Sequence, residues 1–184
     1  MKRSFLIVIF TLICSHAFAH ENWIMSAQIS TTFKPQLDTA TEQIIQNKQQ
    51  LGFGANFGIP IDDYFSLELG YQFLGNSKYQ SNSILYSQSV HSLSLSSTFT
   101  MPVSLPNFYP FNAYGRLGYE AWEATSNLIA LEESGTGLFY GIGAIFDLDR
   151  DLDFMLEAQF RNTKAITDLD SSLVTLSSGV KFKF

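Results

Sequence analysis

The sequence predicts an all-β fold, an eight-stranded antiparallel up-and-down transmembrane β-barrel. Three observations lead to this prediction. Apolar and polar residues alternate in eight separate runs, each about nine residues long, which is the length that a tilted strand needs to cross a bilayer. The connections between these runs are alternately short and long. Charged residues make up only 15% of the chain, against about 25% in ordinary soluble domains.

Each run has one apolar face, because successive side chains of a strand point to opposite sides of the sheet. In the run 65–73 (FSLELGYQF) the odd positions are large and apolar, whereas the even positions are small or polar. The runs 51–59 and 138–146 carry glycines on the second face instead. In chain order, the eight predicted strands are 23–29, 51–59, 65–73, 93–101, 111–119, 138–146, 152–160 and 174–184.

Charge distinguishes a membrane barrel from a soluble sandwich of two sheets. No charged residue occupies the apolar positions of the eight runs. A soluble sandwich would bury those positions and leave the charged face in water, whereas a membrane barrel turns them to lipid and encloses the polar face. The charged positions on the second face are Glu68, Arg116, Glu120, Asp153, Glu157, Arg161, Lys181 and Lys183.

The connections and the last run favour the barrel. Short periplasmic turns, longer external loops and two periplasmic termini are the usual arrangement of bacterial outer-membrane barrels. The last run alternates Val180, Phe182 and Phe184 up to a terminal aromatic residue, which is typical of a final barrel strand. The short predicted connections are 60–64, 102–107 and 147–151, and the long ones are 32–50, 75–89, 123–136 and 162–171.

The first 19 residues have the pattern of a secretory signal peptide. Lys2 and Arg3 precede an apolar run at 5–14, which is too short to cross a bilayer, and small residues flank Phe18 at the expected cleavage site. We therefore expect a signal peptide over 1–19 and an outer-membrane barrel domain over 20–184. Without Lys2 and Arg3 the net charge of −6 becomes −8, and such acidity argues against nucleic acid as a partner.

Four aromatic residues lie near the ends of predicted strands. Trp23, Tyr64, Tyr109 and Trp122 are expected in the aromatic girdles that barrels form at the two membrane interfaces. Ordinary packing is the alternative interpretation for each of them.

Several stretches of the sequence resemble the transmembrane domain of the OmpA family. They are 50–55 (QLGFGA), 65–75 (FSLELGYQFLG), 114–119 (YGRLGY) with Trp122, 156–160 (LEAQF) with Asn162, and 176–184. The resemblance implies an eight-stranded antiparallel barrel with surface loops. Members of that family anchor the envelope, contact host surfaces or form narrow pores. Resemblance to outer-membrane proteins also implies that the barrel-insertion machinery reads the last strand through an assembly signal of Val180, Phe182 and Phe184.

The inward-facing charges are the candidate functional residues. An eight-stranded barrel is barely wide enough for its inward side chains, so charges inside it must pair. Glu68, Arg116 and Glu157 lie near mid-strand and match the lumen ion network of the OmpA family. Glu120, Lys181 and Lys183 are further candidates. A gated ion pathway and a salt-bridged plug that fills the interior are the two interpretations. We favour the plug.

Other lumen positions depart from the OmpA family. Met155, Ile145 and Thr98 stand where that family carries charges, so a homologous gate does not follow from the resemblance. Inward glycines leave room for large neighbours or for water. These glycines are Gly52, Gly54, Gly58, Gly141 and Gly143.

No catalytic, cofactor-binding or metal-binding residue is predicted. Catalysis would need a base, and the only histidines in residues 20–184 are His20 and His91. A serine–histidine pair needs hydrogen-bond reach, but His91 and Ser92 are adjacent in a strand and point to opposite faces. The sequence has no Cys/His cluster for zinc and no phosphate-binding glycine loop.

Partners are expected at the external loops, which a barrel holds over the cell exterior. In the first and longest loop, Ile44 and Ile45 either extend the second strand or form a helical turn, and we prefer the extension. The stretch 127–134 (NLIALEES) offers an apolar contact surface or a tucked hairpin. No loop carries a dense basic run, so binding of heparin-like polymers is not indicated.

These features predict an integral outer-membrane protein with a structural and surface-interactive role in envelope integrity, adhesion or colonisation. A narrow pore or solute channel is the alternative, and a lipid A-modifying enzyme ranks third. The expected partners are outer-membrane lipids and lipopolysaccharide, the barrel-insertion machinery and, through the loops, host or cell surfaces.

Overall fold

The computed structural model describes residues 23–33, 44–45, 49–81, 84–126, 133–164 and 170–184. The predicted signal peptide, most of the first external loop and the apolar stretch at 127–132 lie outside the described residues. Within the described ranges the chain forms strands joined by turns, and no helix there is long and apolar enough to cross a membrane.

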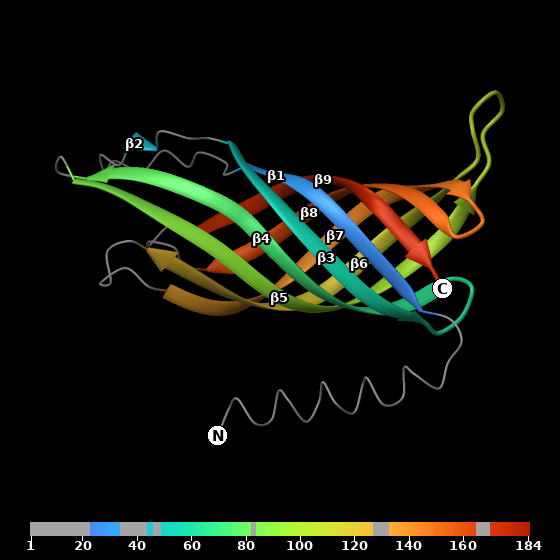
Figure 1. Ribbon diagram of the computed structural model, residues 1–184, viewed down its shortest axis with the longest axis horizontal. Coiled ribbons are helices and arrows are strands. Elements are labelled where there is room, and N and C mark those ends of the chain that lie inside the picture. Colours follow the sequence, from blue (N-terminus) through green and yellow to red (C-terminus); the bar gives the residue numbers. More distant parts are fainter. Residues whose placement is uncertain (1–22, 34–43, 46–48, 82–83, 127–132, 165–169) are drawn as a thin grey trace, which may run out of the picture.

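Eight long strands and one short strand make up the described structure (Figure 1). The predicted runs fall within the long strands, apart from the terminal positions Trp23 and Phe184. The strands are β1 (Ile24–Phe33), β2 (Ile44–Ile45), β3 (Gln49–Pro60), β4 (Phe65–Ser81), β5 (Ile84–Val103), β6 (Phe111–Ser126), β7 (Glu133–Asp149), β8 (Leu152–Lys164) and β9 (Asp170–Lys183).

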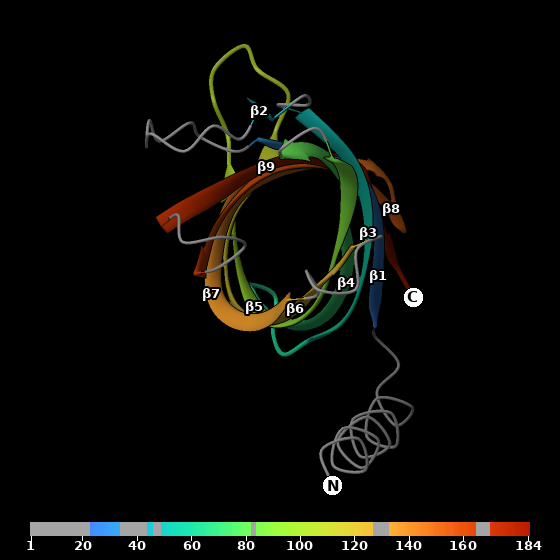
Figure 2. The same cartoon turned by 90° about the vertical axis from the view of Figure 1, so that its left-hand side faces the viewer.

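Each long strand pairs antiparallel with two neighbours, so the sheet closes on itself (Figure 2). From β3 to β9, strands that follow one another in the chain are neighbours in the sheet, and β1 pairs with both β3 and β9. Closure leaves no open strand edge in the membrane, where unpaired backbone groups would be costly. The predicted eight-stranded up-and-down barrel is therefore confirmed.

The first and last strands form the closing seam. β1 pairs with β9 along its length, beginning with Ile24 opposite Lys183. The N–H of Phe184 donates to the carbonyl of Trp23 at 3.0 Å, and the two rings stack with their centroids 3.9 Å apart. The terminal aromatic residue thus packs against the start of the first strand.

The two faces of the wall separate as the alternation predicts. Along β1, buried positions alternate with more exposed ones. Outward side chains are large and apolar, with Leu51 exposed to 80% and Ile29 to 68%, as expected for a wall that faces hydrocarbon. Buried polar side chains on the inner face include Ser26, Gln28, Ser30, Thr32, Gln72, Thr98, Gln159 and Thr175.

The four longest strands are far longer than a bilayer requires. β4, β5, β6 and β7 contain 17, 20, 16 and 17 residues, whereas about 9–11 are enough to cross. The long loops predicted at 75–89 and 123–136 are therefore wrong in extent. Most of 75–89 continues the β4–β5 hairpin, in which Ser81 pairs with Ile84. Beyond the membrane a strand needs no apolar face, so the sequence pattern disappears although the pairing continues.

The short strand β2 lies beside the outer part of β4. Ile44 pairs with Gln80 and Ile45 with Tyr79, on the edge of β4 that β3 occupies further down. Ile44 and Ile45 therefore form a strand and not a helical turn, as the preferred interpretation predicted.

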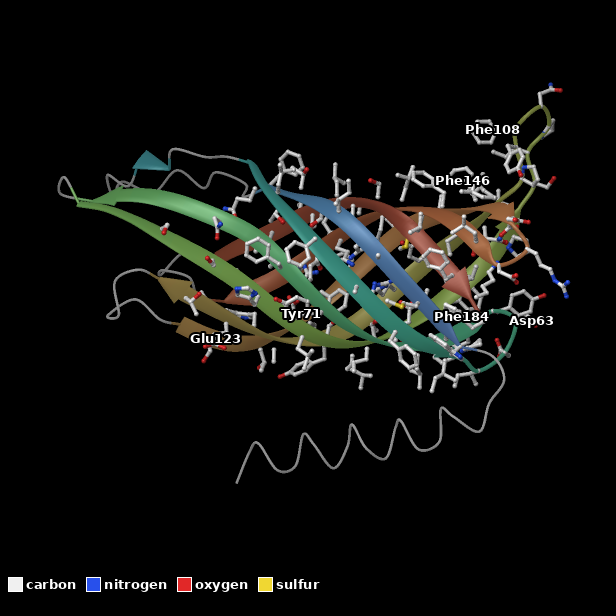
Figure 3. All side chains as sticks on the ribbon, viewed as in Figure 1. Asp63, Tyr71, Phe108, Glu123, Phe146 and Phe184 are labelled. Atoms are coloured by element: carbon white, nitrogen blue, oxygen red, sulfur yellow. The ribbon has the colours of Figure 1, made fainter. Side chains whose placement is uncertain are left out.

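The barrel has two distinct ends. We call the end with the short connections and the last residues of β9 the turn end, where Asp63 and Phe184 are labelled in Figure 3. The opposite end, to which the β4–β5 hairpin extends, is the hairpin end. In the β3–β4 turn, Asp62 Oδ1 accepts the N–H groups of Tyr64 and Phe65, both at 2.7 Å, which stabilises a tight turn.

Candidate functional site in the barrel lumen

Charged side chains converge inside the barrel from β4, β6 and β8. These strands carry Glu68, Arg116 and Glu157 on their inward faces, and all three side chains are buried. A buried charge without a partner would destabilise the fold strongly. The arrangement of these three residues therefore bears on whether the lumen is an ion pathway or a salt-bridged plug.

Arg116 joins the two carboxylates in a first ion-pair layer. Its Nη2 donates to Glu68 Oε2 at 3.0 Å, and its Nε lies 3.3 Å from Glu157 Oε1. Ser66 Oγ donates to Oε1 of Glu68 at 3.3 Å. The guanidinium carbon of Arg116 also lies 5.9 Å from the ring centroid of Tyr114, so the cation has an aromatic neighbour as well as two anions.

Arg161 forms a second layer on the same three strands. Its guanidinium pairs with Glu120 of β6 and donates to Gln72 of β4 and to Gln159 of its own strand. It also lies over the ring of Phe139, 5.2 Å from the centroid. Glu120, Gln72 and Arg161 each follow a member of the first layer by four residues, so the second layer repeats the first with the arginine on a different strand.

The structure brings together part of the predicted network. Its three mid-strand members are in contact, whereas Glu120 has a different partner, Arg161. Parity places Arg161 on the second face, but the predicted network does not include it, although it lies only one residue beyond its apolar run. β8 continues to Lys164, so position 161 lies within the wall and points inward. Its place on the second face was the available signal, since Glu120, which also lies one residue beyond its run, was included.

Lys181 lies at the turn end, where its charge is within electrostatic range of Glu68. Among the described residues it forms no ion pair, while Lys183 lies 2.9 Å from Asp153 and 3.6 Å from Asp147. Lys181, Lys183 and Asp153 line an open pocket of about 420 Å³ at this mouth of the barrel. Lys181 is therefore a residue of the rim that interacts with the predicted central network through its charge, without a direct ion pair.

An apolar layer of three residues on β6, β7 and β8 lies between this rim and the first ion-pair layer. Tyr114, Ile145 and Met155 form a buried cluster there. Ile145 and Met155 are two of the positions where the OmpA family carries charges, so apolar packing takes the place of ions at this level.

A second apolar layer fills the lumen towards the hairpin end. Its central residue is Trp122, which is only 3% exposed. The expectation that Trp122 belongs to an outer girdle is wrong, because β6 keeps its inward face up to Ala124. Tyr64 and Tyr109 are exposed near strand ends, as expected. The cluster consists of Leu74, Val90, Trp122, Ala124 and Leu173.

The β6–β7 pair shows how large side chains fit into so narrow a lumen. Large inward residues of one strand stand opposite glycines of the other. A Cβ on Gly143 would come within 2.5 Å of the Tyr114 ring, and one on Gly118 within 2.4 Å of the Phe139 ring. These glycines therefore make room for large neighbours. The opposed pairs are Tyr114–Gly143, Arg116–Gly141, Phe139–Gly118, Glu120–Gly137 and Trp122–Gly135.

His91 is the one histidine among the described residues. His91 faces outward from β5, and its Nδ1 lies 2.8 Å from the hydroxyl oxygen of Tyr71. Ser92 is buried on the lumen side, so the wall separates this serine from the imidazole. In the described part of the chain, no three His, Cys, Asp or Glu residues are grouped so that they could hold a metal ion.

Comparison with known sequences identifies the family. Residues 5–184 match the family described as outer membrane protein beta-barrel domain. Over 146 residues the chain is 30% identical to outer membrane protein A of Klebsiella aerogenes, covering 75% of this chain and 40% of that protein. The chain thus spans less than half the length of that relative.

Solved structures with a similar fold are small outer-membrane barrels. Neisserial surface protein A has a TM-score of 0.63 at 15% identity, covering 90% of this chain and 100% of that one. OprG from Pseudomonas aeruginosa has a TM-score of 0.61 at 14% identity, covering 89% and 95%. Ail of Yersinia pestis has a TM-score of 0.54 at 16% identity, covering 89% and 98%. These likenesses concern the fold alone. With the family match over nearly its whole length, the chain belongs to the outer membrane protein β-barrel domain family and is a protein of the bacterial outer membrane.

Proposed function

We propose that this protein is a non-conducting, non-enzymatic anchor in the outer membrane that presents its hairpin end to the cell exterior. Its role is in envelope integrity, adhesion or colonisation. The observation that carries the proposal is the filled lumen, in which two ion-pair layers lie between two apolar layers.

An ion crossing this lumen would meet several barriers in series. It would have to displace the partners of Arg116 and of Arg161, whose side chains are buried. It would also have to pass both apolar layers, and apolar constrictions exclude water and ions. The network therefore acts as a salt-bridged plug that stabilises the barrel from inside.

The outward orientation of the hairpin end is part of the proposal. Short turns lie in the periplasm in bacterial barrels and longer segments face outward, which places both chain ends in the periplasm. The β4–β5 hairpin at 76–89 (NSKYQSNSILYSQS) is rich in Ser, Asn, Gln and Tyr. These residue types supply adaptable hydrogen bonds and contact area in binding surfaces. The similar barrel Ail is named the attachment invasion locus protein, which supports an attachment role.

A hairpin exchange tests the surface role. Residues 77–88 are replaced by Asn-Gly, a pair suited to a two-residue hairpin, so that the hydrogen bond from Ser89 Oγ to Asn76 Oδ1 (2.6 Å) is kept beside the new turn. We expect the barrel to assemble and the adhesion of producing cells to cultured animal cells to fall several-fold. Asp63→Ser at the turn end is the control and should leave adhesion unchanged. Unaltered adhesion after the exchange would count against the proposal.

A narrow pore is the second candidate, because one side of the lumen is polar. Recording from refolded protein in planar bilayers distinguishes the two functions. We expect silence under voltage, and silence also from Arg116→Ala, since both apolar layers remain in that variant. Stepwise currents from the unaltered protein would refute the plug. The polar side of the lumen consists of Ser26, Gln28, Ser30, Asn56, Thr175 and Ser177.

Lipid A modification is the third candidate. The separation of His91 from Ser92 by the wall supports a non-enzymatic role. Mass spectrometry of lipid A from cells with and without the gene should give identical spectra. A mass difference that disappears in His91→Gln would establish an enzyme instead.

A further inference from the structure

The connection between β5 and β6 differs from the other short connections of the turn end. The sequence predicts a tight turn at 102–107, but β5 ends at Val103 and β6 begins at Phe111. Residues 104–110 (SLPNFYP) therefore form a longer segment, which we call the β5–β6 arm. It stands away from the barrel wall in both views (Figures 1 and 2), and Phe108 on it is labelled in Figure 3.

The arm is apolar, and hydrogen bonds hold it both within itself and to β7. The N–H of Phe108 donates to the carbonyl of Leu105 at 3.2 Å, across Asn107 with its φ of 64°, a conformation that asparagine tolerates. The hydroxyl of Tyr109 donates to the carbonyl of Asp147 at 3.0 Å. Although bonded in this way, Leu105, Phe108 and Tyr109 remain 50%, 60% and 62% exposed.

The arm also lacks charge. No Asp, Glu, Lys or Arg occurs between Lys78 and Arg116. Clustered exposed apolar side chains indicate a membrane or protein contact, and uncharged aromatic segments are favoured at the membrane interface. The other two turns of this end, by contrast, carry Asp62 and Asp63, and Asp149, Arg150 and Asp151.

A hollow in the outer wall lies next to the arm. Its floor is made of small outward residues, Ala113, Gly115 and Ala144, and larger residues such as Phe99 and Ile142 surround them. A Cβ added to Gly115 would meet no atom within 4 Å. The hollow measures about 780 Å³ and is lined mainly by lipid-facing residues of β5 to β9.

An aromatic ladder connects the hollow with the arm. The ring centroids of Phe108 and Phe111 are 6.1 Å apart, those of Phe111 and Phe146 are 5.7 Å apart, and those of Phe146 and Phe154 are 6.3 Å apart. The last three rings stand on β6, β7 and β8 at the turn-end side of the hollow. Hollow, ladder and arm therefore form one continuous apolar surface.

We propose that this surface binds a phospholipid of the periplasmic leaflet, with an acyl chain in the hollow and the arm at the level of the headgroup. The proposal rests on the orientation proposed above, which places the turn end in the periplasm. The surface continues the wall that already faces lipid, and its aromatic rings suit the interfacial level. An uncharged surface also suits a hydrocarbon chain better than a polar partner.

A second copy of this chain is a less suitable occupant. A two-fold contact brings the same patch of both copies together, so hollow would face hollow. The resulting void would leave the lining residues without van der Waals partners. A flexible acyl chain can follow the hollow and fill it.

Single nitroxide probes test the arm. Cys14 is the sole cysteine, so Cys14→Ser leaves an engineered cysteine as the one thiol. Phe108→Cys is compared with Asp63→Cys in an exposed turn and Leu95→Cys on the lipid-facing wall. In vesicles of phosphatidylethanolamine and phosphatidylglycerol, probes at 108 and 95 should be more accessible to oxygen than to a water-soluble nickel complex, and the probe at 63 should show the reverse. A probe at 108 that behaves like the one at 63 would overturn the proposal.

Photo-cross-linking tests the hollow. Phospholipids with a diazirine in one acyl chain, incorporated in the same vesicles, should cross-link preferentially to β5–β9 rather than to β1, β3 and β4. Gly115→Trp, which fills the hollow, should reduce this cross-linking several-fold. Leu117→Trp on the same strand and face is the matched control and should not. Even cross-linking around the barrel, no effect of Gly115→Trp, or protein dimers instead of lipid adducts would each overturn the proposal. Neither readout depends on adhesion or conductance.

Discussion

At the scale of single residues, Arg116 and Arg161 explain why the lumen charges occur in sets. Each guanidinium is buried and contacts side chains from β4, β6 and β8. These strands are not neighbours in the sheet, so each arginine braces the barrel across its interior. Removal of one cation leaves carboxylates in a region where water cannot readily replace it.

Arg116→Ala should lower the free energy of unfolding by about 3–5 kcal/mol, because Glu68 and Glu157 lose the partner that neutralises them. Urea titration of protein refolded into phospholipid vesicles measures this change.

Two further variants show whether the loss of stability comes from the unpaired carboxylates. Combining Arg116→Ala with Glu68→Gln and Glu157→Gln should recover part of the stability. Arg150→Ala, in the exposed β7–β8 turn, should change it by less than about 0.5 kcal/mol. If Arg116→Ala behaves like Arg150→Ala, the lumen is hydrated and the pairs contribute little.

At the scale of elements, β6 and β7 fit each other because large and small residues alternate between them on the inner face. The opposing glycines accept rings and a guanidinium that would otherwise collide with the wall. Gly115 is the outward glycine of β6, and it makes room for no neighbouring side chain. A Cβ added there would lie in open space.

Gly143→Ala should destabilise the barrel by about 1–3 kcal/mol, the usual range for overpacking. The new methyl would lie 2.3 Å from the carbonyl oxygen of Leu156 and 2.5 Å from the Tyr114 ring. Gly115→Ala is the matched control, for which we expect no loss of stability. Equal effects of the two substitutions in urea titrations would show that space on the inner face is not limiting.

Deletion of Phe184 tests the proposed assembly signal of β9. The deletion removes the stacking on Trp23, but burial of one such ring contributes only about 1.5–3 kcal/mol. We therefore expect assembly in cells to fall much more than spontaneous refolding in detergent. Val180→Thr, on the same face of β9, is a second variant of the signal. Unchanged surface levels of the deletion variant would argue against recognition by the insertion machinery.

At the scale of the whole molecule, the barrel is a stack of levels along its axis. From the turn end these are a polar rim, an apolar layer, two ion-pair layers and a second apolar layer. The outer wall shows a different arrangement, with mainly apolar side chains and the arm at one end only.

Labelling in intact cells tests the proposed orientation of this stack. In the Cys14→Ser background, Ser81→Cys at the end of β4 should react with a membrane-impermeant maleimide, because the hairpin end faces outward. Asp63→Cys should react only after the outer membrane is permeabilised. The reverse pattern would place the chain ends outside the cell and would remove the basis for a periplasmic-leaflet lipid site.

The sequence alone determined the strand class, the number of long strands and the face to which each membrane-spanning residue points. These properties follow from a local period of two, because a strand in this environment must be apolar on one side. The same parity placed Glu68, Arg116, Glu120 and Glu157 inside the barrel before any contact was known.

The tertiary structure decided which of these inward residues meet. Partner choice depends on the stagger of the strands around the closed barrel, which relates residues far apart in sequence and leaves no local pattern. Glu120 therefore pairs with Arg161 rather than Arg116, and Trp122 lies inside the barrel instead of in a girdle. The extent of the hairpins and the β5–β6 arm were likewise decided in three dimensions, because outside the hydrocarbon region pairing continues without requiring an apolar face.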